Sequence, residues 1–181
     1  KKEMYDLLPK HLYPATFNVM PGEDFDLVME RFRQSGIRYP FVAKPEVGCQ
    51  GILFRKIDTE EEFRNYHANL PVEYIVQELV SYPMEVSVFY IRHPKEQKGT
   101  VTGFLHKIPL QVTGNGKDTL EQLVLKHPKG QKRMGEMHSK HKERWNEILP
   151  AGEKYMLSYA ANHNRGAHFV DLREHIDDKL V

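Results

Sequence analysis

The chain has 181 residues, of which 40% are hydrophobic and 28% are charged, and its 26 Lys and Arg nearly balance 25 Asp and Glu. These proportions are ordinary for a folded domain, and no apolar run approaches the roughly 18 residues that cross a bilayer, so membrane insertion is not expected. A net charge of +1 gives no overall field that would indicate nucleic acid or an anionic membrane as a partner.

Cysteine content and the two ends of the sequence bear on location. The single cysteine, Cys49, excludes an internal disulfide, and the opening KKEMYDLLPK lacks the apolar stretch of a signal peptide. We therefore expect a reducing cytoplasm, with Cys49 as a small loop residue. Because the chain opens without Met and ends on HIDDKLV, we expect it to be an excised piece of a longer protein.

The first predicted elements are a helix and a strand. Residues 23–36 place apolar side chains at helical spacing and end at a glycine, which predicts an amphipathic helix. The apolar run YPFVAKP at 39–45 predicts a strand. Gly48 and Gly51 then mark a loop.

The middle of the chain predicts one more helix among several strands. ILFRKI at 52–57 alternates as a strand does, and residues 58–70 carry acids in the first turn of a predicted helix. Residues 73–80, 84–92 and 99–108 are rich in β-branched and aromatic side chains, which predicts three strands.

The last third is less regular. A turn at 112–118 leads to a predicted short helix at 119–126, and residues 129–142 read as a long exposed loop or hinge. ERWNEIL at 143–149 predicts a helix, and residues 153–177 have strand-like character. The order of elements predicts an α+β protein with mostly antiparallel sheets and flanking helices.

One motif suited to phosphate is FVAKPEVGCQG at 41–51. Lys44 would place a positive charge on a rigid strand, while Gly48 and Gly51 would let backbone N–H groups approach phosphate oxygens. The sequence lacks the GK[ST] triplet of a Walker loop. Taken alone, the motif is equally typical of a plain loop after a strand.

A second motif is VQELVSYPMEVSV at 76–88, which ends one strand and begins another. In a nucleotide pocket, the carbonyl of Glu78 and the amide of Val80 could pair with the adenine edge. Glu85 could accept hydrogen bonds from ribose hydroxyls. The competing interpretation is a β-hairpin that carries a solvated glutamate.

Taken in order, these motifs resemble the ATP-grasp superfamily, as does KIPLQVTGNGKDTLEQLV at 107–124, which is similar to a segment of cyanophycin synthetases and bifunctional glutathione synthetases. Asn115 departs from the aspartate usual there. The resemblance implies an ATP-grasp fold made of a small lid subdomain and part of the large subdomain. It implies three parts: a lead-in with one helix at 1–39, the lid subdomain at 40–82 and part of the large subdomain at 83–181.

Carried over to matching positions, the resemblance implies that Lys44 contacts the ATP phosphates and that the loop from Glu46 to Gly51, with Gly48, folds over them. It places the adenine among Gln77, Glu78 and Val80, and the ribose on Glu85. Lys107 or His106 follows as a phosphate or substrate contact, and Lys107 is the better catalytic candidate because its charge persists at pH 7. Lys44 and Glu85 are expected to share one cleft.

Such ligases, which include the D-alanine–D-alanine ligases, use ATP and Mg²⁺ to activate a carboxylate as an acyl phosphate that an amine attacks. ATP and small carboxylate and amine substrates are therefore the implied partners. The metal-binding acids are mostly missing: Asp171 could match one of them, and no metal ligand is assigned. The chain alone is therefore expected to show little or no ligase turnover.

Other interpretations remain open. Asn162, His163 and Arg165 could form a substrate-side patch or merely a capped turn. The chain could be a non-catalytic ATP-binding or regulatory module. A nucleic-acid patch at 127–144 is the least favoured, because that stretch contains acids and lacks interleaved aromatic residues, and the scattered histidines do not form a zinc motif.

Overall fold

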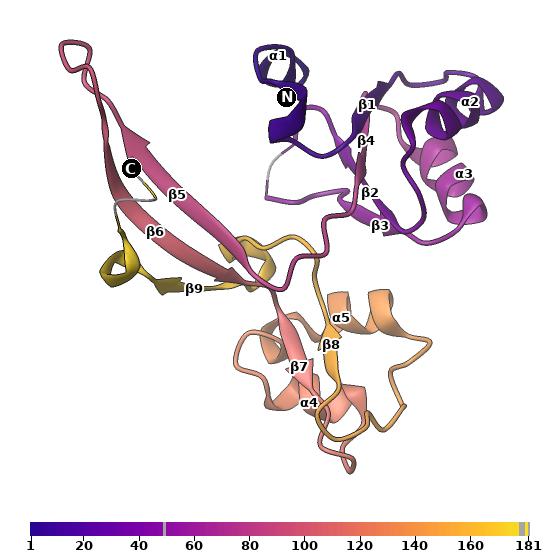
Figure 1. Ribbon diagram of the computed structural model, residues 1–181. Coiled ribbons are helices and arrows are strands. Elements are labelled where there is room, and N and C mark those ends of the chain that lie inside the picture. Colours follow the sequence, from indigo (N-terminus) through magenta and orange to yellow (C-terminus); the bar gives the residue numbers. More distant parts are fainter. Residues whose placement is uncertain (49, 178–179, 181) are drawn as a thin grey trace. The chain divides into compact units, whose positions relative to one another are not determined.

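The computed structural model describes residues 1–48, 50–177 and 180, so Cys49 lies outside the described residues. The chain divides into two compact units, Lys1–Ser81 and Tyr82–Val181. The predicted α+β class with antiparallel sheets is confirmed (Figure 1). Across the described part of the chain, every helix is too short or too polar to cross a membrane.

The first unit is built on one four-stranded antiparallel sheet with the order β1-β4-β2-β3. Its elements are α1 (Lys2–Asp6), a 3-10 turn η1 (Lys10–Leu12), β1 (Thr16–Val19), α2 (Phe25–Ser35), β2 (Phe41–Pro45), β3 (Arg55–Ile57), α3 (Glu60–Asn69) and β4 (Tyr74–Glu78). Strand β1 and helix α2, which precede residue 40, thus belong to the same unit as the motif around Lys44.

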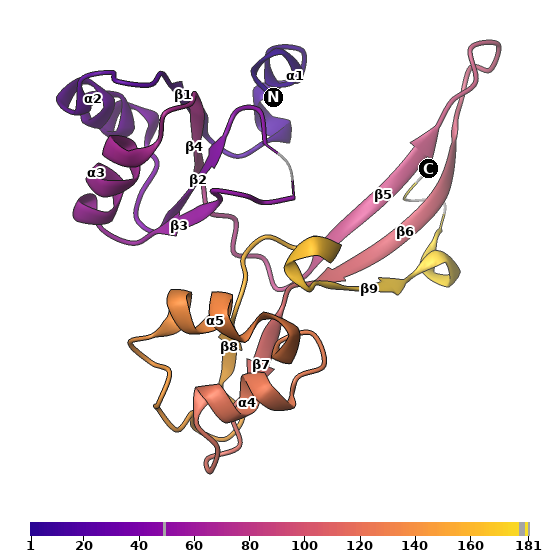
Figure 2. The same cartoon turned by 180° about the vertical axis from the view of Figure 1, so that it is seen from behind.

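Helices α2 and α3 cover one face of this sheet (Figures 1 and 2). Asp24 caps α2 and Thr59 caps α3, each by accepting hydrogen bonds from the first turn. Between the helices and the sheet, the rings of Phe32, Phe41 and Phe63 contact one another in a buried core. The helix-covered face is thus fixed by aromatic packing, which leaves the opposite face of the strands for other contacts.

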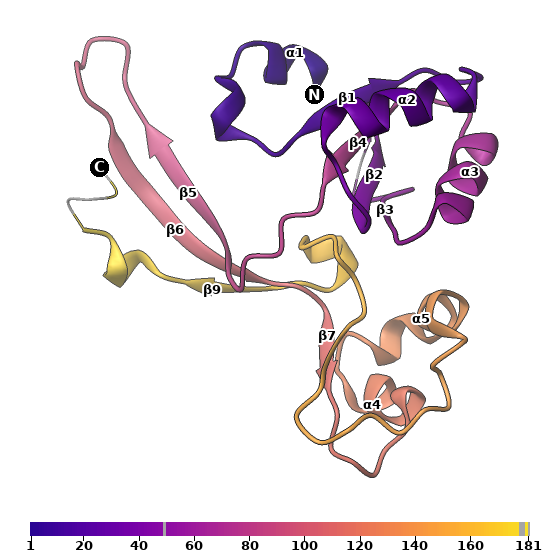
Figure 3. The same cartoon turned by 45° about the vertical axis from the view of Figure 1, so that its right-hand side comes forward.

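The second unit contains two sheets with the strand orders β5-β6-β9 and β7-β8. Its elements are β5 (Glu85–Ile91), β6 (Thr100–Ile108), β7 (Gln111–Thr113), α4 (Leu120–Lys126), η2 (Gln131–Arg133), α5 (Met134–His141), β8 (Lys154–Met156), η3 (His163–Arg165), β9 (His168–Asp171) and η4 (Arg173–His175). Strands β5 and β6 form a long ribbon, as Figure 3 shows. Strands β4 and β5 lie in different sheets, so residues 76–88 do not form a β-hairpin.

A compact core forms around α4 and α5, where Leu120, Met137, Trp145 and Leu149 are buried together. Helix α4 begins with a full capping box, in which Thr119 and Gln122 each bond the backbone of the other. By contrast, β5 carries several exposed apolar side chains, including Val88, which is 44% exposed.

Three predicted elements were wrong or too long. Residues 131–141 form η2 and α5 rather than a loop, because Met137 supplies an apolar anchor within a basic sequence. ERWNEIL is not helical, since the carbonyls of Trp145 and Glu147 accept hydrogen bonds from the start of α4. The strand predicted at 52–57 begins only at Arg55, because Leu53 has a left-handed backbone (φ 59°).

We expect Thr119→Ala to lower the free energy of unfolding of the second unit by about 1 kcal/mol, because it removes one half of the capping box. Trp145 is the chain's one tryptophan and packs in the same core, so urea unfolding followed by its fluorescence measures the change. Thr119→Ser should keep most of the stability. Equal losses in the two variants would contradict the role of the hydroxyl.

Candidate functional site

Lys44 lies near the end of β2, on the sheet face opposite the α2 and α3 helices. Because side chains alternate along a strand, Phe41 and Ala43 enter the helix-covered core while Lys44 points to the other face. The facing strand β4 presents Gln77 to this same face. The Lys44 Nζ donates a hydrogen bond of 2.7 Å to the Oε1 of Gln77.

The amide of Gln77 is the centre of a small polar network. Its side chain is only 7% exposed, and its Nε2 donates to the hydroxyls of Thr16 at 2.7 Å and Tyr5 at 3.0 Å. Tyr5 belongs to α1, which lies over this face of the sheet, and its ring contacts that of Tyr13. Sequence reasoning missed Tyr5, since no motif surrounds it.

Burial lowers the pKa of Lys44 from its ordinary value, and the nearby charge of Lys1 lowers it further, while Glu46 opposes the change. An ammonium in this position is therefore poorly solvated. Its charge is favoured by any anion brought to the same face, because an opposite charge within a few ångströms stabilises the protonated form.

The predicted phosphate loop begins at Glu46. Its carboxylate accepts a hydrogen bond of 2.6 Å from the Lys2 backbone and pairs with the amino group of Lys1. Although burial alone raises the pKa of Glu46, these bonds hold it below its usual range. Gly51 has φ 70°, which requires glycine-like freedom, whereas a Cβ at Gly48 would meet only ordinary contacts.

The chain leaves the first sheet after Glu78. The Glu78 amide donates to the carbonyl of Ala15 at 2.9 Å, and its side chain is exposed. Val80 follows outside any strand and is 50% exposed. The proposed adenine contacts Gln77, Glu78 and Val80 therefore lie together where β4 ends and an irregular segment begins.

In the second unit, the structure brings Glu85 and Lys107 together. They lie opposite each other in the β5–β6 register and form an ion pair. Lys107 is also opposite Phe169 on β9, so these side chains share one sheet face. His106 alternates to the other face, which separates it from Lys107.

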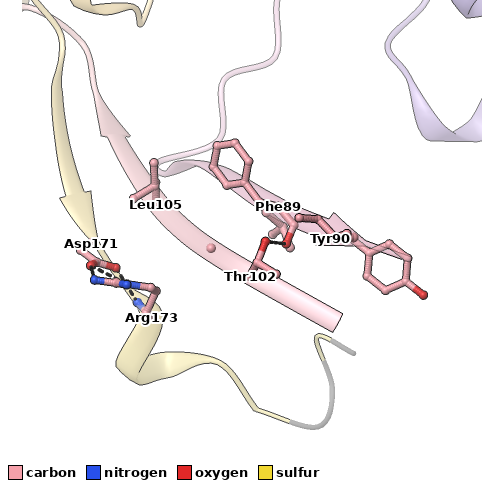
Figure 4. Close-up of a pocket in the computed structure, with 9 residues that line it drawn as sticks. Phe89, Tyr90, Thr102, Leu105, Asp171 and Arg173 are labelled. Carbon is pink, nitrogen blue, oxygen red and sulfur yellow. Dashed lines mark hydrogen bonds and ion pairs between the residues drawn. The ribbon is translucent and has the colours of Figure 1, made fainter. Parts of the chain in front are cut away.

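Asp171 lies on the same face as Glu85 and Lys107, because it is opposite Leu105 in the register. The carboxylate of Asp171 accepts hydrogen bonds from the guanidinium of Arg173, at 2.7 Å for Nε. That bond holds the pKa of Asp171 below its ordinary value. Figure 4 shows this pair beside a shallow depression of about 620 Å³, lined also by Phe89 and Leu105.

The metal ligands were tested against the described residues. Within residues 1–48, 50–177 and 180, His, Asp and Glu side chains form no group of three that could hold a metal ion. Asp171, the acid expected to match a family ligand, is instead bound by Arg173. The described side chains therefore do not fit a Mg²⁺ site, and no chemical step is assigned to one.

Comparison with known proteins gives little further information. No family model matches the chain, and no curated protein matches it. Among solved structures, a bifunctional glutathione synthetase from Pasteurella multocida is similar over 92% of this chain, with 14% identity and a TM-score of 0.36. The chain spans 24% of that protein. A likeness at this level carries no argument about function, and the interpretation of the site depends on its own residues.

We expect Gln77→Met to lower the free energy of unfolding by about 1–3 kcal/mol, because the Lys44 ammonium loses its side-chain acceptor. Urea unfolding followed by circular dichroism measures this. In a double-mutant cycle with Lys44→Met, the pair should show a coupling of roughly 0.5–3 kcal/mol. Gln34→Met, on the exposed side of α2, is the matched control. Additive losses at Lys44 and Gln77 would contradict their interaction.

Proposed function

We propose that this chain is an ATP-binding part of an ATP-grasp ligase that activates a carboxylate as an acyl phosphate for attack by an amine. The observation that supports this most is the Lys44–Gln77 pair, a half-buried ammonium on a central strand beside the segment that leaves β4. The ordered motifs at 41–51 and 76–88 supply the family, and the antiparallel sheets fit it.

Lys44 is proposed to bind the nucleotide phosphates. Its Nζ can exchange the neutral amide of Gln77 for a phosphate oxygen, which is a stronger, charge-assisted partner. The poor solvation that lowers the pKa of Lys44 favours this exchange. The loop from Glu46 through Gly48 to Gly51 would then cover the phosphates with its backbone N–H groups.

The adenine is proposed to lie against the end of β4. Backbone groups of Glu78 and Val80 would pair with its polar edge, since this segment has left the ladder and Val80 is half exposed. Gln77 would act from the sheet, where its side chain already links Lys44 to Thr16 and Tyr5.

Glu85 and Lys107 are proposed to serve the ribose and the transferred phosphoryl group. In the reaction, a substrate carboxylate oxygen bonds to the γ-phosphorus of ATP, the bond to the bridging oxygen breaks, and ADP leaves. An amine then attacks the acyl carbon, phosphate leaves, and the amine loses a proton. Lys107 would spread the charge of the transferred group, for which its ion pair with Glu85 must open.

A second candidate is a non-catalytic ATP-binding or regulatory module. One observation favours it: Asp171, the acid nearest Lys107 in the same unit's sheet register, is engaged by Arg173, and the described carboxylates do not cluster as metal ligands. Nucleotide binding is common to both candidates, so binding and turnover have to be measured separately.

The binding test is calorimetry of ATP with the full 181-residue chain, with and without Mg²⁺. We expect saturable binding that Lys44→Met weakens by at least about tenfold, since a charged hydrogen bond is worth roughly 1.5–3 kcal/mol. Lys98→Met, which lies in the β5–β6 loop, is the matched control. Absence of ATP binding, or unchanged affinity in Lys44→Met, would overturn the proposal.

The turnover test is trapping of acyl phosphates as hydroxamates across a panel of amino acids and small carboxylates. The described residues do not assemble a metal site, so we expect no Mg²⁺-ATP-dependent hydroxamate from this chain. Hydroxamate that forms with the wild type and disappears in Lys107→Met would refute the expected inactivity and favour the ligase over the regulatory module.

A further inference from the structure

A cluster of charged side chains in the second unit surrounds Glu136. Its carboxylate pairs with Arg133 at 3.0 Å, with Lys140 at 2.6 Å and with Arg165 at 2.8 Å. The three cations come from η2, α5 and η3, which are separate elements. Their side chains are between 18% and 32% exposed, so they are accessible to solvent without being fully hydrated.

The cluster is held in place by the surrounding turn. Asn162 accepts a hydrogen bond of 2.9 Å from the Arg165 backbone, and Gly166 continues with φ 88°. A side chain at Gly166 would meet Leu110 at 3.0 Å, so the turn packs closely on the core. Lys129 donates to the carbonyl of Ala167 in the same turn. The capped turn thus exists, and it also orients the guanidinium of Arg165.

Charge in the cluster is unbalanced. Three cations meet one carboxylate, which leaves a local surplus of two positive charges. Burial alone raises the pKa of Glu136, but Lys140, Arg165 and Arg133 together hold it below its ordinary value. Glu136 therefore stays ionised near neutral pH, where it holds the cations close together without neutralising them.

We propose that Arg133, Lys140 and Arg165 bind a small dianionic oxyanion, either a phosphate group or a dicarboxylate, with Glu136 as the residue that positions them. Two planar guanidinium groups suit the paired oxygens of such ligands, and the ammonium adds a third charge. This site is independent of the proposed nucleotide site around Lys44. It gives the residues at 162–165 a ligand-binding role in addition to that of a capped turn.

Binding is tested on the full chain by calorimetry with inorganic phosphate and, separately, with succinate, each at constant ionic strength set with chloride. We expect saturable binding of at least one of them, and the two titrations distinguish phosphate from dicarboxylate ligands. Arg165→Met should weaken it by about tenfold or more, whereas Arg173→Met, an exposed guanidinium on the same unit, should leave it unchanged.

Two further variants separate a binding site from a structural ion-pair network. Glu136→Gln removes the competing charge, so phosphate or succinate should bind several-fold more tightly; a purely structural network predicts lower stability and no gain in binding. Lys44→Met should leave this binding unchanged, which distinguishes the site from the nucleotide site. No saturable binding in the wild type, or equal effects of Arg165→Met and Arg173→Met, would overturn the proposal.

Discussion

The hydrogen bond between the Lys44 ammonium and the Gln77 amide is the interaction on which the nucleotide proposal depends. A cation on a central strand is costly to bury, and a neutral amide only partly compensates for its lost hydration. The α2 and α3 helices close one face of the sheet with aromatic rings, so this polar pair is confined to the other. A charged ligand on that face would relieve the cost, which is why the pair indicates anion binding.

Much of the first unit could be predicted from sequence because its signals are local. Helix α2 has its cap, its apolar spacing and its terminal Gly36 within a dozen residues, and β2 is bounded by prolines. The contacts of Gln77 were not predictable. They join Thr16, Tyr5 and Lys44, which are separated by up to 72 residues, and nothing in the pattern marks Tyr5 as a partner.

In the second unit the errors have one physical cause. Helix α5 is anchored by Met137 in a stretch of mostly polar residues, so its composition resembles a loop. Trp145 and Glu147 look helical but give their carbonyls to α4, a tertiary demand that periodicity cannot show. The pairing of Glu85 with Lys107 follows from strand register, which the sequence left unspecified, and Glu136 carried no motif at all.

The central claim is that the Lys44 ammonium leaves Gln77 to bind an ATP phosphate. It is tested most directly by nuclear magnetic resonance of the lysine Nζ nitrogens during an ATP titration. The account predicts that the Lys44 signal shifts in step with saturation and shows coupling to phosphorus. A Lys44 signal that stays unchanged while ATP saturates the protein would contradict it.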